Sequence, residues 1–141
     1  MNSIPRFHLA FPVKDLETTR SFYVDLLECK TGRESKSWID FDLYGHQIVA
    51  HLSPNDCHTL ETNIVDHDNV PSRHFGVILG WEHWEQLHKK LKKLKFKFLI
   101  EPKIRFKSKV GEQGTFFISD PSNNALEFKS FKNDTQVFKK V

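Results

Sequence analysis

Residues 7–27 read FHLAFPVKDLETTRSFYVDLL, and this stretch decides the fold class. Phe7–Val13 is a short apolar run bounded by Pro5 and by Lys14-Asp15, which predicts a buried strand. Asp15 is a residue type that caps helix N-termini, and the apolar residues after it recur at steps of three and four, as on one face of a helix. The helical stripe consists of Leu16, Thr19, Phe22, Tyr23, Leu26 and Leu27. The chain therefore begins with a strand followed by a helix.

Two further apolar segments complete the first half. Gly32 marks a break after the helix, and Trp38–Leu43 leads into the turn signal Tyr44-Gly45. Gln47–Leu52 (QIVAHL) is another strand candidate. We therefore expect residues 7–53 to form a βαβββ module.

The same order starts again after a polar stretch. Residues 53–72 are rich in Asn, Asp and Pro and predict a loop. His74–Leu79 predicts a strand, and the apolar spacing between Trp81 and Leu94 predicts a helix. The strand candidates after this helix are Phe96–Ile100, the stretch around Ile104–Phe106, Thr115–Ser119 and Leu126–Phe131, with turn residues at 120–124. Residues 74–131 thus repeat the βαβββ order.

The predicted fold class is α+β, with one domain over residues 1–141 built from two paired βαβββ modules. We expect module 1 over about 5–53, a linker over 54–72, module 2 over about 73–131 and a polar tail over 132–141. A four-stranded unit with one helical cover leaves a sheet face unburied. Two such sheets placed side by side would form a concave mixed sheet, a natural ligand site.

The composition excludes several classes of function. The formal net charge of +3 over 141 residues is too mild to predict a nucleic-acid partner. No apolar run approaches the roughly 20 residues of a membrane span, and the start of the chain has no signal-peptide pattern. Two cysteines without a CxxC pair favour reduced thiols in a cytoplasmic protein. The unusual count is eight histidines, because histidine is the common metal ligand and near-neutral proton carrier.

Three histidines lie in or beside strand candidates, at matching places in the two halves. His8 is on the first strand of the first half, and His74 is at the first strand of the second half. His51 is on the last strand of the first half, and the matching strand of the second half carries Glu127 among apolar neighbours. A charge in such a stretch needs a partner. Two imidazoles and one carboxylate form the facial triad of non-haem Fe(II) enzymes, so these positions predict a metal site.

Several motifs resemble those of a known family. Arg6–Leu16 (RFHLAFPVKDL) with Arg20–Tyr23 resembles the opening of vicinal-oxygen-chelate proteins, which include glyoxalase I, bleomycin-resistance proteins and extradiol dioxygenases. Asp120–Phe128 (DPSNNALEF) resembles their closing motif, which contains the metal-binding glutamate. Three middle motifs resemble a subgroup described as predicted extradiol-type dioxygenases: Trp38–Asp42, Gly45–Gln47 and Ala50–Leu52. The resemblance covers roughly residues 5–131.

The resemblance implies a metal-holding cleft with His8, His74 and Glu127 as ligands. It implies a divalent metal, with Fe(II) favoured over Mn, Ni or Zn, and a homodimer. The favoured activity is an extradiol-type dioxygenase acting on a small catecholic substrate. The alternatives are a glyoxalase-type metal-dependent isomerase or lyase, and a non-catalytic protein that binds a small molecule.

The remaining site residues follow from the same resemblance. His51 falls where glyoxalase-like members have a fourth ligand, usually a glutamate, so it is either a ligand or a general acid–base. His46 is a second acid–base candidate. Trp38, Phe106 and Phe117 would suit an aromatic substrate pocket, and Arg105 could hold an acidic substrate group.

Overall fold

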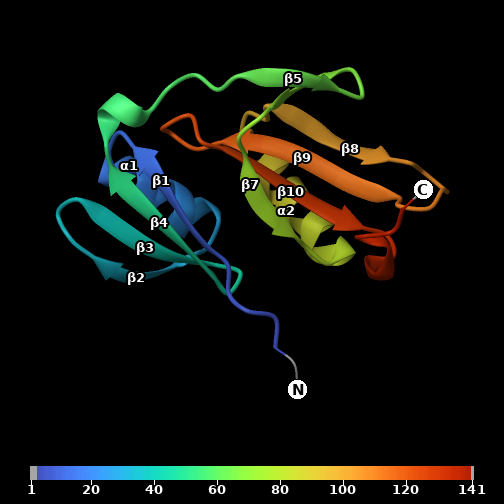
Figure 1. The fold of residues 1–141 in the computed structure, drawn as a ribbon, viewed down its shortest axis with the longest axis horizontal. Helices are drawn as coiled ribbons and strands as arrows, with labels where there is room; N and C mark the ends of the chain where they lie inside the picture. The colour runs from blue at the N-terminus through green and yellow to red at the C-terminus, as the bar shows by residue number, and fades with distance from the viewer. Residues whose placement is uncertain (1–2, 141) are drawn as a thin grey trace. The chain divides into compact units, whose positions relative to one another are not determined.

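A computed structural model describes residues 3–140 (Figure 1). Their strands form two four-stranded mixed sheets and one two-stranded hairpin. The chain divides into two units. Unit 1 comprises the residues up to Leu60 together with Asp120–Asn124, and unit 2 comprises Glu61–Ser119 and the residues after Asn124.

Unit 1 contains the predicted βαβββ module. Its elements are β1 (His8–Val13), α1 (Leu16–Arg20), the π-helix η1 (Ser21–Leu26), β2 (Lys30–Glu34), β3 (Trp38–Leu43), β4 (His46–Leu52) and the 3₁₀ turn η2 (Pro54–Asp56). The sheet order is β1-β4-β3-β2, in which β1 and β4 are parallel and the other neighbours antiparallel. The fold class is therefore as predicted.

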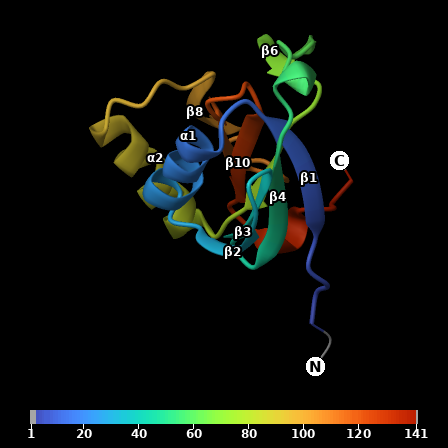
Figure 2. The same cartoon turned by 90° about the vertical axis from the view of Figure 1, so that its left-hand side faces the viewer.

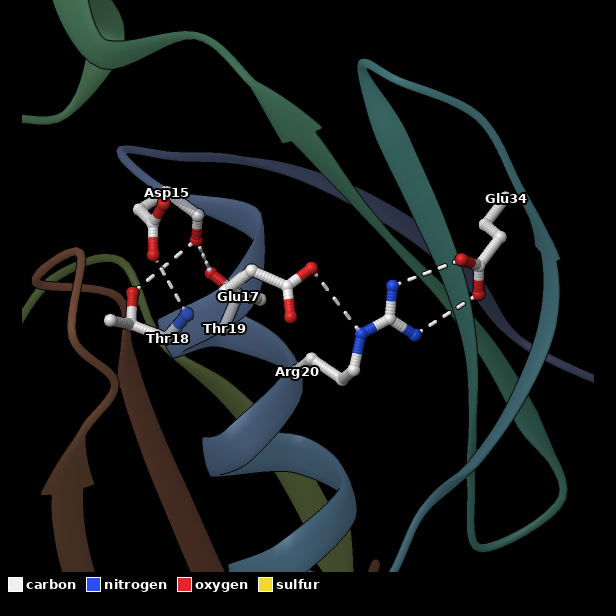
Figure 3. Close-up of polar contacts among 6 residues, drawn as sticks. All are labelled: Asp15, Glu17, Thr18, Thr19, Arg20 and Glu34. Carbon is white, nitrogen blue, oxygen red and sulfur yellow. Dashed lines mark hydrogen bonds and ion pairs between the residues drawn. The ribbon is translucent and has the colours of Figure 1, made fainter.

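The helix of unit 1 begins at the predicted cap. Asp15 Oδ2 accepts the Thr18 backbone N–H at 2.8 Å, which satisfies one of the donors that a helix start leaves unpaired. Arg20 reaches from α1 to Glu34 on β2, with two hydrogen bonds of 3.1 and 2.9 Å (Figure 3). The second half of the helix widens into η1, where the Leu27 N–H donates to the carbonyl five residues earlier at 3.1 Å.

The sheet of unit 1 has one buried and one open face. Tyr23 is fully buried and its ring lies 5.6 Å from that of Phe11 and 5.1 Å from that of Phe41. The helix covers this side of the sheet (Figure 2). Because side chains alternate along a strand, His8 on β1 and Gln47 on β4 face the other side.

Unit 2 repeats the order. Its elements are β5 (Thr62–Val65), β6 (Asp68–Pro71), β7 (Phe75–Ile78), α2 (Trp81–Lys93), β8 (Ile100–Arg105), β9 (Gln113–Ser119), β10 (Ala125–Phe131) and the 3₁₀ turn η3 (Asp134–Gln136). The larger sheet has the order β7-β10-β9-β8, with β7 and β10 parallel. Trp84 anchors α2 to this sheet, since its Nε1–H donates to the Phe128 carbonyl at 3.0 Å.

Three local expectations were wrong. The polar stretch between the modules contains the β5–β6 hairpin rather than only a loop, with its turn at Asp66 and His67, both at positive φ. The two strand candidates after α2 are replaced by a single strand, β8. Residues with left-handed backbone lie on either side of it: Lys95 just after the helix and Phe106 just after the strand. Gly32 lies inside β2, where a register shift between Thr31 and Glu34 absorbs it.

In the part of the chain that the structure describes, no helix is long and apolar enough to cross a membrane.

Candidate metal centre

His74 and Glu127 form a pair within unit 2. His74 directly precedes β7, and Glu127 lies on β10 opposite Gly76 of β7. The parallel pairing of these strands brings His74 Nε2 to 3.5 Å from Glu127 Oε1. The Glu127 side chain is only 13% exposed, and that of His74 is 30% exposed. A nitrogen and a carboxylate oxygen therefore face one another from neighbouring strands.

The other ring nitrogen of His74 fixes the tautomer. His74 Nδ1 lies 2.7 Å from the Pro71 carbonyl oxygen. A carbonyl can only accept, so Nδ1 carries the proton and Nε2 of the neutral ring has a free lone pair. The edge of this ring also contacts Phe117, with centroids 5.0 Å apart. A neutral His74 ring therefore offers Nε2 to a metal ion.

Glu127 is held as a carboxylate. Burial raises the pKa of Glu127, but hydrogen bonds from His74 and Thr115 and the charge of Lys129 outweigh it, so the net pKa lies below the ordinary value. Thr115 Oγ1 donates to Glu127 Oε2 at 2.7 Å, and Lys129 Nζ lies 3.7 Å from Oε1. The hydrogen bond from a protonated Nε2 to Glu127 is also the main cause that raises the pKa of His74, so a metal ion at Nε2 has to displace that proton.

His8 lies on the open face of unit 1. It is exposed and sits beside Gln47 in the parallel pair β1–β4. His8 Nδ1 is 2.8 Å from Gln47 Oε1, which leaves Nε2 free of that contact. Each unit therefore contains a histidine whose Nδ1 is hydrogen-bonded.

The other two histidines lie elsewhere on β4. His51 is exposed on the same face as His8, but its register partner on β1 is Pro12, four residues beyond His8. At 3.2–3.4 Å per residue this separation is about 13 Å along the strands. His46 alternates onto the opposite face, and its Nδ1 accepts the Phe7 backbone N–H at 2.9 Å.

The predicted substrate-binding residues have varied surroundings. The Arg105 guanidinium pairs with Asp66 of the β5–β6 turn and lies 5.2 Å from the ring centroid of Phe106, which is about half exposed. Phe117 is buried and contacts His74 as described. In unit 1, Trp38 is partly exposed and lies under the Arg33 guanidinium.

A cavity of about 470 Å³ opens in unit 1 beside Gln47, and Asp40 also lines it. Its cationic lining residues are Arg6, Lys30 and Arg33. This volume is that of a small-molecule site.

Three polar neighbours of the candidate ligands carry no chemical signal in the sequence on their own: Gln47, Thr115 and Lys129. Alternation within Gln47–Leu52 would put Gln47 on the face of His51, but only the β1–β4 register brings it to His8.

Within residues 3–140, no three His, Cys, Asp or Glu side chains come together as a complete ligand set. The His74–Glu127 pair fits part of one. Adjacent ligands at about 2.1 Å from an ion lie roughly 3 Å apart, close to the separation of these two atoms. The donor types, neutral imidazole and carboxylate, suit a first-row divalent metal.

The fold and these residues define a class of protein: two βαβββ modules, each with a histidine beside its first strand. A family model for the glyoxalase/bleomycin resistance protein/dioxygenase superfamily matches residues 7–128, and the chain belongs to this superfamily. No curated protein matches the chain.

Solved structures agree with this assignment. A glyoxalase/bleomycin resistance protein/dioxygenase from Alicyclobacillus acidocaldarius is 36% identical, with 95% of this chain and 96% of that chain covered and a TM-score of 0.80. The fosfomycin resistance protein FosX from Listeria monocytogenes is 15% identical, with 97% and 99% covered and a TM-score of 0.67. A lactoylglutathione lyase from Agrobacterium tumefaciens is 11% identical, with 92% and 96% covered and a TM-score of 0.62. The last two share the fold.

Proposed function

We propose that the chain is a metal-dependent, extradiol-type dioxygenase that acts on a small catecholic substrate, with His8, His74 and Glu127 as the ligands of one Fe(II) ion. The observation that carries this proposal is the His74–Glu127 pair, in which Nε2, the ring nitrogen not used by Pro71, lies 3.5 Å from a carboxylate oxygen. When bound, the metal would supply Lewis acidity and open positions for two adjacent substrate oxygens.

The number of ligands favours the dioxygenase over the isomerase or lyase. A glyoxalase-type centre would need a fourth ligand at His51. The register of β1 and β4 puts His51 about 13 Å from His8 along the strands, so in this proposal His51 acts beside the ion rather than as a ligand. Two histidines and one carboxylate leave the three open positions that a chelating substrate and dioxygen require.

The surrounding residues keep the ligands ready. Pro71 O and Thr115 Oγ1 hold His74 and Glu127 in fixed orientation, which limits the reorganisation needed on metal binding. The hydrogen bond from Thr115 and the charge of Lys129 both help to lower the pKa of Glu127, so the carboxylate charge offsets part of that of the cation.

His51 is the proton carrier in this proposal. It shares the open face of unit 1 with His8, and its neighbour across the antiparallel pair β3–β4 is Trp38. His46, on the opposite face, has no role in the proposal.

The test uses the purified full chain, loaded anaerobically with Fe(II) and then mixed with catechols in an oxygen-electrode cell. We expect catechol-dependent oxygen uptake and ring-opened product. The His74→Ala variant should lose bound iron and activity, whereas His83→Ala, which changes an exposed histidine on α2, should keep both. Gel filtration of the same sample tests the expected homodimer.

Two results would overturn the proposal. Unchanged metal content in His74→Ala and Glu127→Ala would remove the ligand assignment. Tight binding of nickel or zinc, with no oxygen uptake by the iron form on any catechol, would leave the isomerase or lyase reading in its place.

A further inference from the structure

A chain of two hydrogen bonds joins His8 to a carboxylate on the open face of unit 1. His8 Nδ1 is 2.8 Å from Gln47 Oε1, and Gln47 Nε2 is 3.3 Å from Asp40 Oδ2. The three residues come from adjacent strands β1, β4 and β3. Asp40 is two residues before Asp42, the register partner of Gln47, so it lies diagonally across the strand pair on the same face.

The carboxylate determines the direction of both hydrogen bonds. An ionised carboxylate can only accept, so the Gln47 amide must turn its NH₂ group towards Asp40. Its carbonyl oxygen, Oε1, then faces His8 and can also only accept. His8 Nδ1 must therefore donate, and the proton of the neutral ring is on Nδ1 rather than Nε2.

We propose that Gln47 and Asp40 are positioning residues that fix His8 in the Nδ1–H tautomer, with the Nε2 lone pair available to a divalent metal ion. This inference rests on the proposed metal centre and extends it to residues that would not touch the ion. Partners of this kind in metalloproteins commonly contribute 10–100-fold to metal affinity.

The two units fix their histidines by different means. In unit 2 the acceptor for His74 Nδ1 is the backbone carbonyl of Pro71, which every side chain at that position would provide. In unit 1 the acceptor is the Gln47 side-chain amide, and its orientation depends on Asp40. A point substitution of the acceptor residue can therefore change the tautomer of His8, whereas it would leave the acceptor of His74 in place.

The first experiment measures the tautomer in the metal-free full chain. Long-range ¹H–¹⁵N correlation spectra of the imidazoles, at a pH where His8 is neutral, distinguish the protonated from the unprotonated ring nitrogen. We expect His8 to be protonated at Nδ1 in the wild type. Both tautomers should be populated in Gln47→Leu, which removes the acceptor, and in Asp40→Asn, whose amide can donate and lets Gln47 flip.

A conservative variant and a matched control make the readout specific. Gln47→Glu keeps an acceptor oxygen and should retain the Nδ1–H tautomer. Gln86→Leu removes an exposed glutamine from α2, whose amide contacts Glu82, and should leave the His8 signals unchanged.

The second experiment titrates the same variants with Zn²⁺ by calorimetry. We expect 10–100-fold weaker binding in Gln47→Leu and little change in Gln47→Glu and Gln86→Leu. A wild-type His8 protonated at Nε2 overturns the inference, and so does a Gln47→Leu spectrum identical to that of the wild type. If instead the tautomers behave as expected but His8→Ala binds Zn²⁺ as tightly as the wild type, the proposed metal centre is wrong while the positioning of His8 stands.

Discussion

Asp120 is a buried carboxylate that accepts hydrogen bonds from four donors of unit 1. Its Oδ1 accepts the backbone N–H groups of Ser122 and Asn124 at 2.8 and 2.9 Å. Its Oδ2 accepts the Asn124 side-chain amide and the Tyr23 hydroxyl, both at 2.9 Å. A single side chain thus orders the turn between β9 and β10 and pairs with the hydroxyl of a fully buried tyrosine.

Replacing this carboxylate should weaken the fold. In Asp120→Asn one acceptor oxygen becomes a donor group that faces other donors, and a buried donor without a partner costs about 1–3 kcal/mol. We expect a loss of that size in the free energy of unfolding, measured by urea titration. The exposed Asp25→Asn on η1 is the matched control and should unfold at the wild-type midpoint. Equal midpoints for all three proteins would contradict the role given to Asp120.

The two cysteines should differ in reactivity. Burial, together with the charge of Asp42, raises the pKa of the Cys29 thiol from 9.0 to about 12. The reactive thiolate is therefore roughly a thousandfold scarcer at neutral pH than for an ordinary thiol, and it increases only as the pH rises towards that value. Iodoacetamide at pH 8, followed by mass spectrometry, should modify the partly exposed Cys57 and leave Cys29 unmodified in the folded protein. Rapid labelling of Cys29 in a Cys57→Ser variant would show that the thiol is accessible.

At the scale of single residues, the sequence predicts which residues lie on strands better than it predicts which side chains contact one another. The duplicated pattern of strands is sufficient to put His74 and Glu127 on strands that pair. It cannot predict that Gln47 contacts His8, because this contact depends on the register of two parallel strands 39 residues apart in the chain.

At the scale of elements, Gly76 of β7 lies directly against the backbone of β10. A Cβ atom added there would lie on the backbone carbonyl of Glu127, whereas one added at Gly80 would meet nothing within 4 Å. The strand pair that carries His74 and Glu127 therefore requires glycine at position 76.

The Gly76→Ala variant tests this requirement. The methyl group must push β7 away from β10, and we expect a loss of about 3 kcal/mol or more in the free energy of unfolding. Gly80→Ala, four residues later at the N-cap of α2, should cost no more than about 1 kcal/mol, because alanine is only a poorer cap than glycine. Thermal unfolding followed by circular dichroism measures both. A Gly76→Ala protein as stable as Gly80→Ala would show that the two strands can separate at no cost.

Elements with a regular apolar pattern are the predictable ones. The periodicity of β1 and α2 predicts their type, because each buries a defined face, and β9 contains the continuous apolar run of a strand buried on both faces. The sequence Lys30–Glu34 (KTGRE) has no such pattern, and the strand β2 exists because its backbone pairs with β3. The β5–β6 hairpin is similarly polar, and ion pairs of Asp66 with Arg105 and of Asp68 with Lys103 join it to β8. Such pairings depend on tertiary contacts, which local propensity does not report.

For the whole molecule, metal removal should lower stability. An ion that binds only the folded chain adds about 2.7 kcal/mol when its free concentration is a hundred times the Kd. We expect Zn²⁺ or Fe(II) to raise the thermal midpoint and EDTA to reverse the rise. His74→Ala should show no such response, and His83→Ala should respond as the wild type does. A rise of equal size in His74→Ala would place the bound metal elsewhere.

The composition of unit 1 has a consequence for how the protein is made. Three of its contacts join residues that are far apart in the chain: Tyr23 with Asp120 (97 residues), Lys14 with Ser122 (108) and Pro12 with Asn124 (112). During synthesis these groups stay without their partners from the time residue 60 is added until residue 124 follows, roughly 3–13 s at usual elongation rates. Unit 1 is therefore completed only after most of unit 2 has been synthesised, so the first half of the chain waits longest for its folding partners.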